Sequence, residues 1–126
     1  MNALPFANYI QSNGIGTVGR DIFLYNMPDS INVGILFTSS LSGTKIDHEL
    51  PNYRKRNFQI IVRSDNYVDG LAISESIMGV LDFANTDVDN YFVKFVRPRT
   101  EPVVYPVSEG DYIEFSLNFE TVFIIN

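Results

Sequence analysis

The sequence predicts an α+β fold: a mixed, largely antiparallel sheet of about five strands with two helices on one face. Three observations favour it. Apolar residues recur at helical spacing over residues 3–13 and 67–84. Apolar and polar residues alternate over residues 113–120, as in a strand with one buried and one solvated face. The expected order, α-β-β-β-α-β-β, joins strands by short links, which is typical of α+β domains.

The first expected helix covers residues 3–13 and is too short to be stable unless it packs on other elements. Asn2 is expected to cap it, and Pro5 falls in the first turn, where its missing N–H does little harm. The helix is expected to end at Gly14, because glycine readily adopts a positive φ.

Two strands are expected next, over residues 22–25 and 33–38, on either side of turn residues 27–30. Their closeness in sequence favours pairing as an antiparallel hairpin. Residues 39–55 are polar and are expected to form one long loop. Loops of this length in compact domains are usually functional or disordered, so this segment is a candidate functional region.

A third strand is expected over residues 57–63, and the main helix over residues 67–84, capped by Asp65 or Asn66. The strand residues expected to face the core are Phe58, Ile60 and Val62. The apolar face of the helix comprises Ile73, Ile77, Val80, Leu81 and Ala84. Two helical glycines, Gly70 and Gly79, each weaken the helix by ~1 kcal/mol relative to Ala, which tight packing on the sheet would explain.

Residues 85–90 are expected to form a polar turn before a fourth strand over residues 91–97. One face of that strand is expected to carry Tyr91, Val93 and Phe95. Residues 98–111 contain three prolines and are expected to form a second long connection before the fifth strand, residues 113–125. With no internal repeat and no linker, residues 1–126 are expected to form a single domain.

Composition excludes several functional classes. The chain of 126 residues has a net charge of −6, which disfavours sequence-independent nucleic-acid binding. It has no Cys, which excludes disulfides, thiol nucleophiles and thiolate metal sites. No apolar run approaches the ~20 residues of a membrane span, so no membrane partner is expected.

Two motifs with possible chemistry are better explained structurally. Residues 14–19 match GxGxxG, but a helix precedes them and a strand follows, the reverse of a dinucleotide site. The only histidine, His48, lies between two acids, and adjacent loop residues rarely converge on one metal ion. No GxSxG elbow surrounds any serine. We therefore expect no catalytic residue, no cofactor and no metal, and the protein is not expected to be an enzyme.

Four segments carry a resemblance to a known family. Residues 9–23 read YIQSNGIGTVGRDIF, residues 27–30 read MPDS, residues 58–63 read FQIIVR before a helix, and residues 115–120 read FSLNFE. On these segments the chain resembles the bacteriophage tail terminator and tail completion proteins, a group often labelled phage minor capsid proteins. The resemblance spans most of the chain.

The resemblance implies a structural protein of the virion tail or neck, present in the host cytoplasm during assembly. Such proteins form a hexameric ring on the head-proximal end of the tail tube. The ring stops tube polymerisation and provides the joining surface for the head connector. The implied partners are other copies of the chain, the tail tube protein and a connector or neck protein, with genomic DNA as passing cargo. A net acidic lumen would let that DNA slide without sticking.

A ring subunit needs two unlike patches, so that head-to-tail contact closes a cycle. The two long connections are the candidates, with basic residues of one copy meeting acids of the next and apolar residues anchoring the contact. The candidate interface residues are Tyr53, Arg54, Lys55, Arg56, Arg97, Arg99, Glu101, Val103, Val104, Tyr105, Glu109 and Asp111.

Two other functions remain open at this point. One is another neck or head-completion protein of the virion. The other is a small regulatory or ligand-binding α+β domain, which would need a pocket with convergent polar groups. An acidic mimic of DNA is a poorer fit, because the acids are scattered from Asp21 to Glu120.

Overall fold

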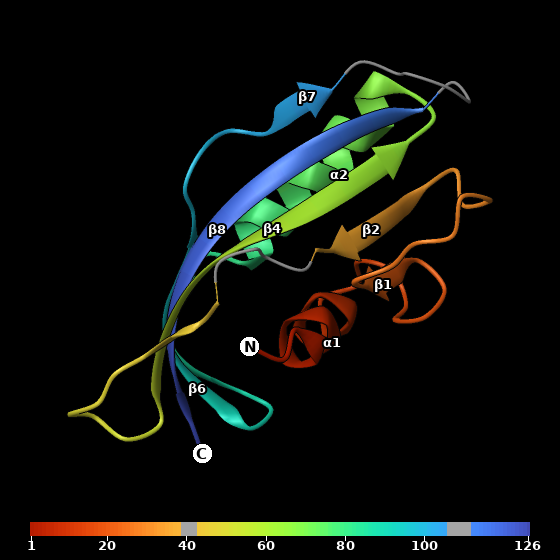
Figure 1. Ribbon diagram of the computed structural model, residues 1–126. Coiled ribbons are helices and arrows are strands. Elements are labelled where there is room, and N and C mark those ends of the chain that lie inside the picture. Colours follow the sequence, from red (N-terminus) through yellow and green to blue (C-terminus); the bar gives the residue numbers. More distant parts are fainter. Residues whose placement is uncertain (39–42, 106–111) are drawn as a thin grey trace.

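The computed structural model describes residues 1–38, 43–105 and 112–126. These residues form two helices and one mixed, mostly antiparallel sheet of eight strands (Figure 1). The helices are α1 (Leu4–Ser12) and α2 (Tyr67–Val80). The strands are β1 (Ile22–Leu24), β2 (Gly34–Phe37), β3 (Lys45–Ile46), β4 (Tyr53–Ser64), β5 (Phe83–Val88), β6 (Tyr91–Pro98), β7 (Val103–Tyr105) and β8 (Ile113–Ile125). The predicted α+β class is confirmed.

The sheet is built around the long antiparallel pair β4–β8, which runs from Tyr53 opposite Ile124 to Ser64 opposite Ile113. Its strand order is β1-β2-β4-β8-β6-β5. The short strand β3 pairs with the start of β4, and the short strand β7 pairs with the start of β8. Because β4 and β8 are antiparallel, β3 and β7 lie at opposite ends and on opposite sides of the central pair.

Both helices cover the same face of the sheet. Phe6 of α1 packs against Phe58 of β4, with ring centroids 5.5 Å apart. Gly70 of α2 lies against the Phe115 ring of β8 and against Ser64, so closely that a Cβ would clash. The predicted core positions Phe58, Ile60 and Val62 are buried, as are the residues facing them on β8: Phe115, Leu117 and Phe119. The tight packing predicted at Gly70 is therefore confirmed, whereas a Cβ at Gly79 would meet nothing.

The start of each helix lies at or within one residue of the capping position predicted from the sequence. Asn66 caps α2 by accepting a hydrogen bond from the Asp69 amide at 2.8 Å. At α1 the N-cap position is Ala3, and the Asn2 side chain accepts from the Leu4 amide at 3.0 Å. In α2 the buried residues are Gly70, Ser74 and Ile77, followed by Leu81 just beyond the helix. Neither of the described helices has the length and apolar character that crossing a membrane requires.

The predicted antiparallel hairpin of β1 and β2 is wrong, because the two strands are parallel, with Ile22 opposite Ile35. The link, residues 25–33, is longer than a tight hairpin turn and folds back along the strands. It contains a turn in which the Ile31 amide donates to the Pro28 carbonyl at 3.1 Å. The chain therefore re-enters the sheet in its original direction.

The expected number of strands, about five, is too low, because three short or polar strands lay in segments interpreted as loop, helix or turn. β3 and the start of β4 lie within residues 39–55, and β7 lies within residues 98–111. β5 replaces the end of the predicted helix and most of the predicted turn. It is an edge strand in which Val88 is the one buried residue, and its apolar and polar residues do not alternate as a half-buried strand requires.

The predicted core face of β6 is wrong beyond Val93, because the strand contains a β-bulge. The register against β8 shifts between Val93 and Phe95. An extra residue in one strand reverses the alternation of side chains beyond it. Val96, rather than Phe95, is consequently buried in the core.

Candidate interaction surfaces

The basic run at residues 54–56 is divided between the two faces of the sheet. All three residues belong to β4 rather than to a loop, and successive strand side chains point to opposite faces. Arg54 and Arg56 are half-buried on the face that carries the helices, whereas Lys55 is exposed on the other face. Tyr53 is half-buried on the same face as Lys55. These three candidate interface residues therefore do not share one surface.

The hairpin that joins β3 to β4 extends beyond the rest of the fold (Figure 1). Asp47 stabilises its turn, because Oδ1 accepts from the amides of Glu49 at 2.8 Å and Leu50 at 3.0 Å. Two apolar side chains are exposed on the hairpin, Ile46 at 60% and Leu50 at 52%. Within the described ranges, no group of three or more metal-ligating side chains is placed to hold an ion.

The β7 segment is a second exposed apolar surface. Val103, Val104 and Tyr105 are between 41% and 50% exposed. Val104 lies opposite Phe115 in register and so faces the helix side of the sheet. There it contributes to a groove of about 580 Å³ between α2 and the chain leading into β7.

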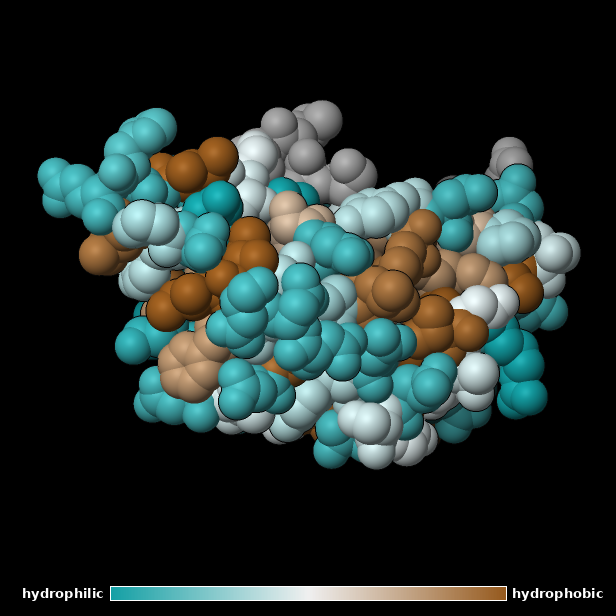
Figure 2. All heavy atoms as spheres, turned by 90° about the horizontal axis from the view of Figure 1, so that it is seen from below, coloured by the Kyte–Doolittle hydropathy of each residue, from teal (hydrophilic) through white to brown (hydrophobic). Residues whose placement is uncertain are grey.

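Acidic residues line the groove between α2 and the chain leading into β7. Three acids line it together with apolar and aromatic side chains from α2. The acids are Glu75, Asp82 and Glu101, all of them exposed. Seen from below, hydrophobic side chains gather in separate patches among hydrophilic ones, rather than in one continuous apolar face (Figure 2).

The remaining predicted interface residues have different surroundings. Arg97 is engaged within its own chain: its Nε lies 2.6 Å from Glu120 Oε1, and its guanidinium lies 4.6 Å from the Phe95 ring centroid. Arg99 is exposed, and its backbone N–H donates to the Asn118 carbonyl at 2.7 Å. Glu109 and Asp111 lie outside the described residues.

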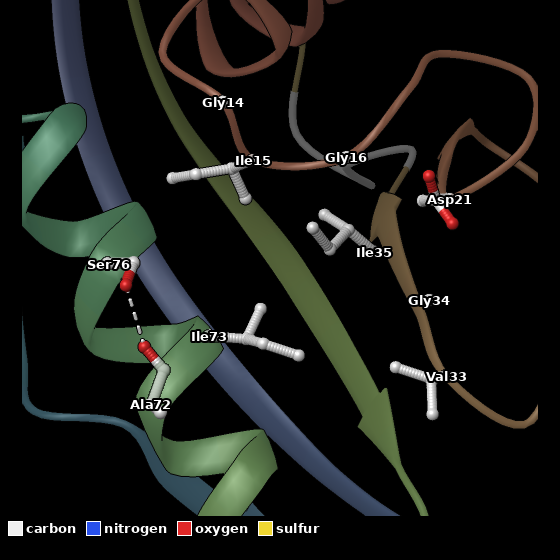
Figure 3. Close-up of a pocket in the computed structure, with 10 residues that line it drawn as sticks. All are labelled: Gly14, Ile15, Gly16, Asp21, Val33, Gly34, Ile35, Ala72, Ile73 and Ser76. Atoms are coloured by element: carbon white, nitrogen blue, oxygen red, sulfur yellow. Dashed lines mark hydrogen bonds between the residues drawn. The ribbon is translucent and has the colours of Figure 1, made fainter.

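An apolar cleft of about 460 Å³ lies between the exit of α1, the start of β2 and one side of α2 (Figure 3). Ile15, Ile35 and Ile73 point into it from these three elements. Gly16 has a φ of +76°, and a Cβ there would lie 3.0 Å from the Asp21 Cβ, so glycine is required. This cleft was not predicted from the sequence, in which the glycine spacing at residues 14–16 is the one signal of it.

The chemistry of this cleft is limited. Its lining includes one charged side chain, Asp21, which already accepts from the Thr17 amide at 3.0 Å and lies 3.5 Å from Arg20. The Thr17 carbonyl in turn accepts from the amides of Arg20, Asp21 and Ile22. The GxGxxG segment thus forms a helix stop and a turn, as predicted.

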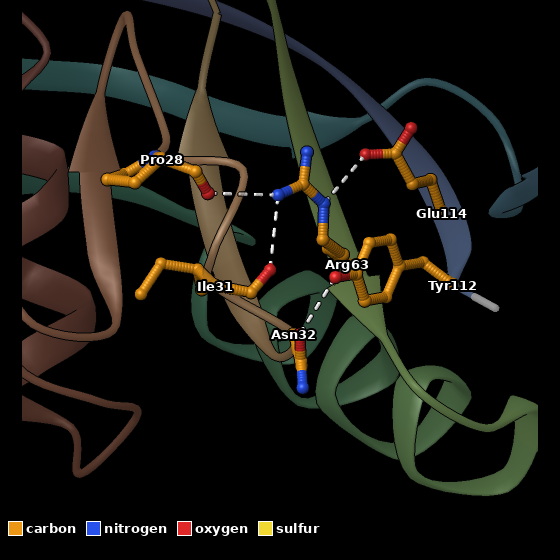
Figure 4. A network of polar contacts seen from close by, with 6 residues as sticks. All are labelled: Pro28, Ile31, Asn32, Arg63, Tyr112 and Glu114. Carbon is orange, nitrogen blue, oxygen red and sulfur yellow. Dashed lines mark hydrogen bonds and ion pairs between the residues drawn. The ribbon is translucent and has the colours of Figure 1, made fainter. Parts of the chain in front are cut away.

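Arg63 joins two of the segments that carried the family resemblance, residues 27–30 and 58–63 (Figure 4). Its Nη1 donates to the carbonyls of Pro28 and Ile31, each at 3.2 Å. Its Nε lies 3.2 Å from Glu114 Oε2, and its guanidinium lies 5.5 Å from the Tyr112 ring centroid. These residues hold the β1–β2 link against the central strands, which is a structural rather than a chemical role.

Tyr91 fastens the start of the chain to β6. Its hydroxyl accepts from the Asn2 amide at 3.0 Å and donates to the Asn2 carbonyl at 3.2 Å. Burial raises the pKa of the Tyr91 phenol above its usual value, and the hydrogen bond to Asn2 opposes that shift.

Comparisons with known proteins identify a family. The family described as "Bacteriophage tail terminator protein" matches residues 9–125. Among solved structures, a chain of the "Virion of native gene transfer agent (GTA) particle" is similar with a TM-score of 0.64 and 13% sequence identity. The similarity covers 84% of this chain and 80% of that chain, and at this identity it shows a shared fold. A search among curated proteins found no match.

Proposed function

Because the chain belongs to the bacteriophage tail terminator protein family, we propose that it caps the head-proximal end of a phage tail tube as a ring of six copies. Its role is that of a structural protein of the phage tail. The cap ends polymerisation of the tube and provides the surface to which the head connector or neck protein joins. The family match over residues 9–125 is the observation that carries this proposal.

The placement of the two exposed surfaces supports a ring. Heterologous contacts close a cycle when one patch of a subunit meets a different patch of the next. The β3–β4 hairpin and the β7 segment are such unlike patches, at opposite ends of the central pair. Each exposes aliphatic side chains, and apolar anchors of this kind stabilise protein interfaces.

Termination follows from the difference between the two axial faces of such a ring. One face binds the last ring of tube protein, whereas the other does not reproduce the surface to which tube subunits add. The tube then stops growing, and the exposed face is left for the connector. The net charge of −6 is compatible with DNA passing through the lumen without adhering.

Deletion of the gene from its parent phage tests the proposal directly. Negative-stain microscopy of the lysate is expected to show full heads beside overlong tails that are not joined to them. A neck or head-completion protein would instead leave tails of normal length unattached to heads. Normal infectious virions would contradict both functions and favour a regulatory or ligand-binding role.

A further inference from the structure

A pocket of about 300 Å³ lies beside the N-terminus, where β3 and the start of β4 meet the end of β8. Its lining includes Met1, Thr44, Ile46, Arg54, Phe123 and Ile125. Arg56 adjoins it, because its Nη1 donates to Thr44 Oγ1 at 2.9 Å. The same hydroxyl oxygen accepts from the Met1 amino group at 2.9 Å. A single neutral oxygen atom thus accepts hydrogen bonds from two cationic groups.

The positive charge of this pocket is uncompensated within the part of the chain that the structure describes. No carboxylate there lies within 4.0 Å of Arg54 or Arg56. Arg54 donates to the Tyr53 carbonyl at 3.0 Å, and the buried Arg56 Nε has no hydrogen-bond partner. Burial lowers the pKa of the Met1 amino group, and repulsion by Arg56 and Arg54 lowers it further. A buried cationic donor without an acceptor is unfavourable, and an anion in the adjoining pocket would offset the charges of Arg54 and Arg56.

The pocket suits a single carboxylate better than a polyanion. A guanidinium and a carboxylate form two parallel hydrogen bonds, which are among the strongest in proteins. Three apolar side chains, Ile46, Phe123 and Ile125, border the pocket and match the aliphatic stem of an acidic residue. The net charge of −6 opposes the approach of a nucleic-acid backbone.

We propose that this pocket binds a side-chain carboxylate from a second copy of the chain. The assignment of the carboxylate to a second copy rests on the ring proposed above. The matching acids are Glu75, Asp82 and Glu101, which line the groove between α2 and β7 and form no ion pair within the described ranges. Since β3 and β7 lie on opposite sides of the central pair, the cationic pocket of one copy meets the acidic groove of the next.

The isolated protein tests the pocket independently of the ring. Thermal unfolding is followed while acetate is titrated at constant ionic strength, with chloride as the balancing anion. The wild-type midpoint is expected to rise saturably with acetate. The half-saturating concentration is expected to increase at least tenfold in Arg54→Gln. Lys55→Gln, which removes a neighbouring charge from the opposite face of the same strand, is expected to respond like the wild type.

Three outcomes would contradict the proposal that this pocket binds a carboxylate. They are an acetate response no larger than that to chloride, equal responses of Arg54→Gln and Lys55→Gln, and tighter binding of phosphate than of acetate. If Arg54→Gln does not fold, judged by circular dichroism, Arg56→Gln replaces it and is held to the same criterion.

A charge exchange in the phage tests the source of the carboxylate. Arg54→Glu is expected to lower the titre of a complemented deletion phage at least tenfold. Adding Glu101→Arg, Glu75→Arg or Asp82→Arg to the same chain is expected to restore at least tenfold for one of the three. Failure of all three to restore the titre would overturn a second copy as the source. If the deletion phage itself forms normal virions, the proposed capping function is contradicted. The acetate titration would still test whether the pocket binds a carboxylate.

Discussion

Arg63 on β4 lies directly opposite Glu114 on β8, and the Arg63 Nε is 3.2 Å from Glu114 Oε2. The two partners are unequally exposed, at 15% for the Arg63 side chain and 41% for that of Glu114. Arg63 additionally donates to two carbonyls of the β1–β2 link. The arginine therefore stabilises the fold mainly through the link, and the ion pair contributes less because water screens it.

Substitutions of the two residues are expected to differ in their effect on stability. Arg63→Ala is expected to lower the free energy of unfolding by about 2 kcal/mol, because it removes charge-assisted hydrogen bonds to two carbonyls. Glu114→Gln is expected to lower it by less than ~1 kcal/mol. Urea denaturation measures both, with the exposed Arg99→Ala as a control. Equal losses in the two variants would contradict this account of the link.

The two glycines of α2 give a matched pair. Gly70→Ala is expected to lower the free energy of unfolding by about 1–3 kcal/mol, because the new methyl group overlaps the Phe115 ring and Ser64. Gly79→Ala is expected to raise it by up to ~1 kcal/mol, because alanine favours the helix and nothing obstructs its Cβ. Chemical denaturation of both variants decides this, and a stable Gly70→Ala would refute the close packing of α2 on β8.

Tyr91 is expected to make stability fall at high pH. Its pKa is raised in the folded protein, so folding favours the protonated phenol. This contribution is fully present below the unfolded value of about 10 and is lost as the pH rises toward the raised value. Below pH 10, Tyr91→Phe is expected to be less stable than the wild type by ~1 kcal/mol, through loss of the Asn2 hydrogen bonds. Unfolding measured from pH 8 to 11 should show this difference shrink above pH 10, and a constant difference would contradict the raised pKa.

Val104→Asp is expected to separate assembly from folding. Val104 is 41% exposed, so the free energy of unfolding is expected to change by less than ~0.5 kcal/mol. A charge introduced into an apolar contact is expected to lower the complemented phage titre at least tenfold. Val68→Asp is the control, because Val68 is 74% exposed at the start of α2 and does not line the groove. Equal titres for the two variants would exclude the β7 segment from the interface.

Local patterns by themselves determined the class of the fold and its central elements. Strict alternation located β8 and the core face of β4, and the capping residue Asn66 located the start of α2. These features depend on neighbours within a few residues, which is the range that periodicity and capping report. The family resemblance likewise rested on short segments, and the match over residues 9–125 confirmed it.

Only the tertiary structure decided the features that depend on distant residues. The link between the parallel strands β1 and β2 is held by Arg63, far along the chain. β5 forms by pairing with β6, because its own residues show no apolar alternation. Strand alternation divided the basic run so that Arg54 joined Thr44 and the N-terminus, while Lys55 faced away. A sequence lists such charges side by side, but their environment is set by which strand lies next to them and which face is covered.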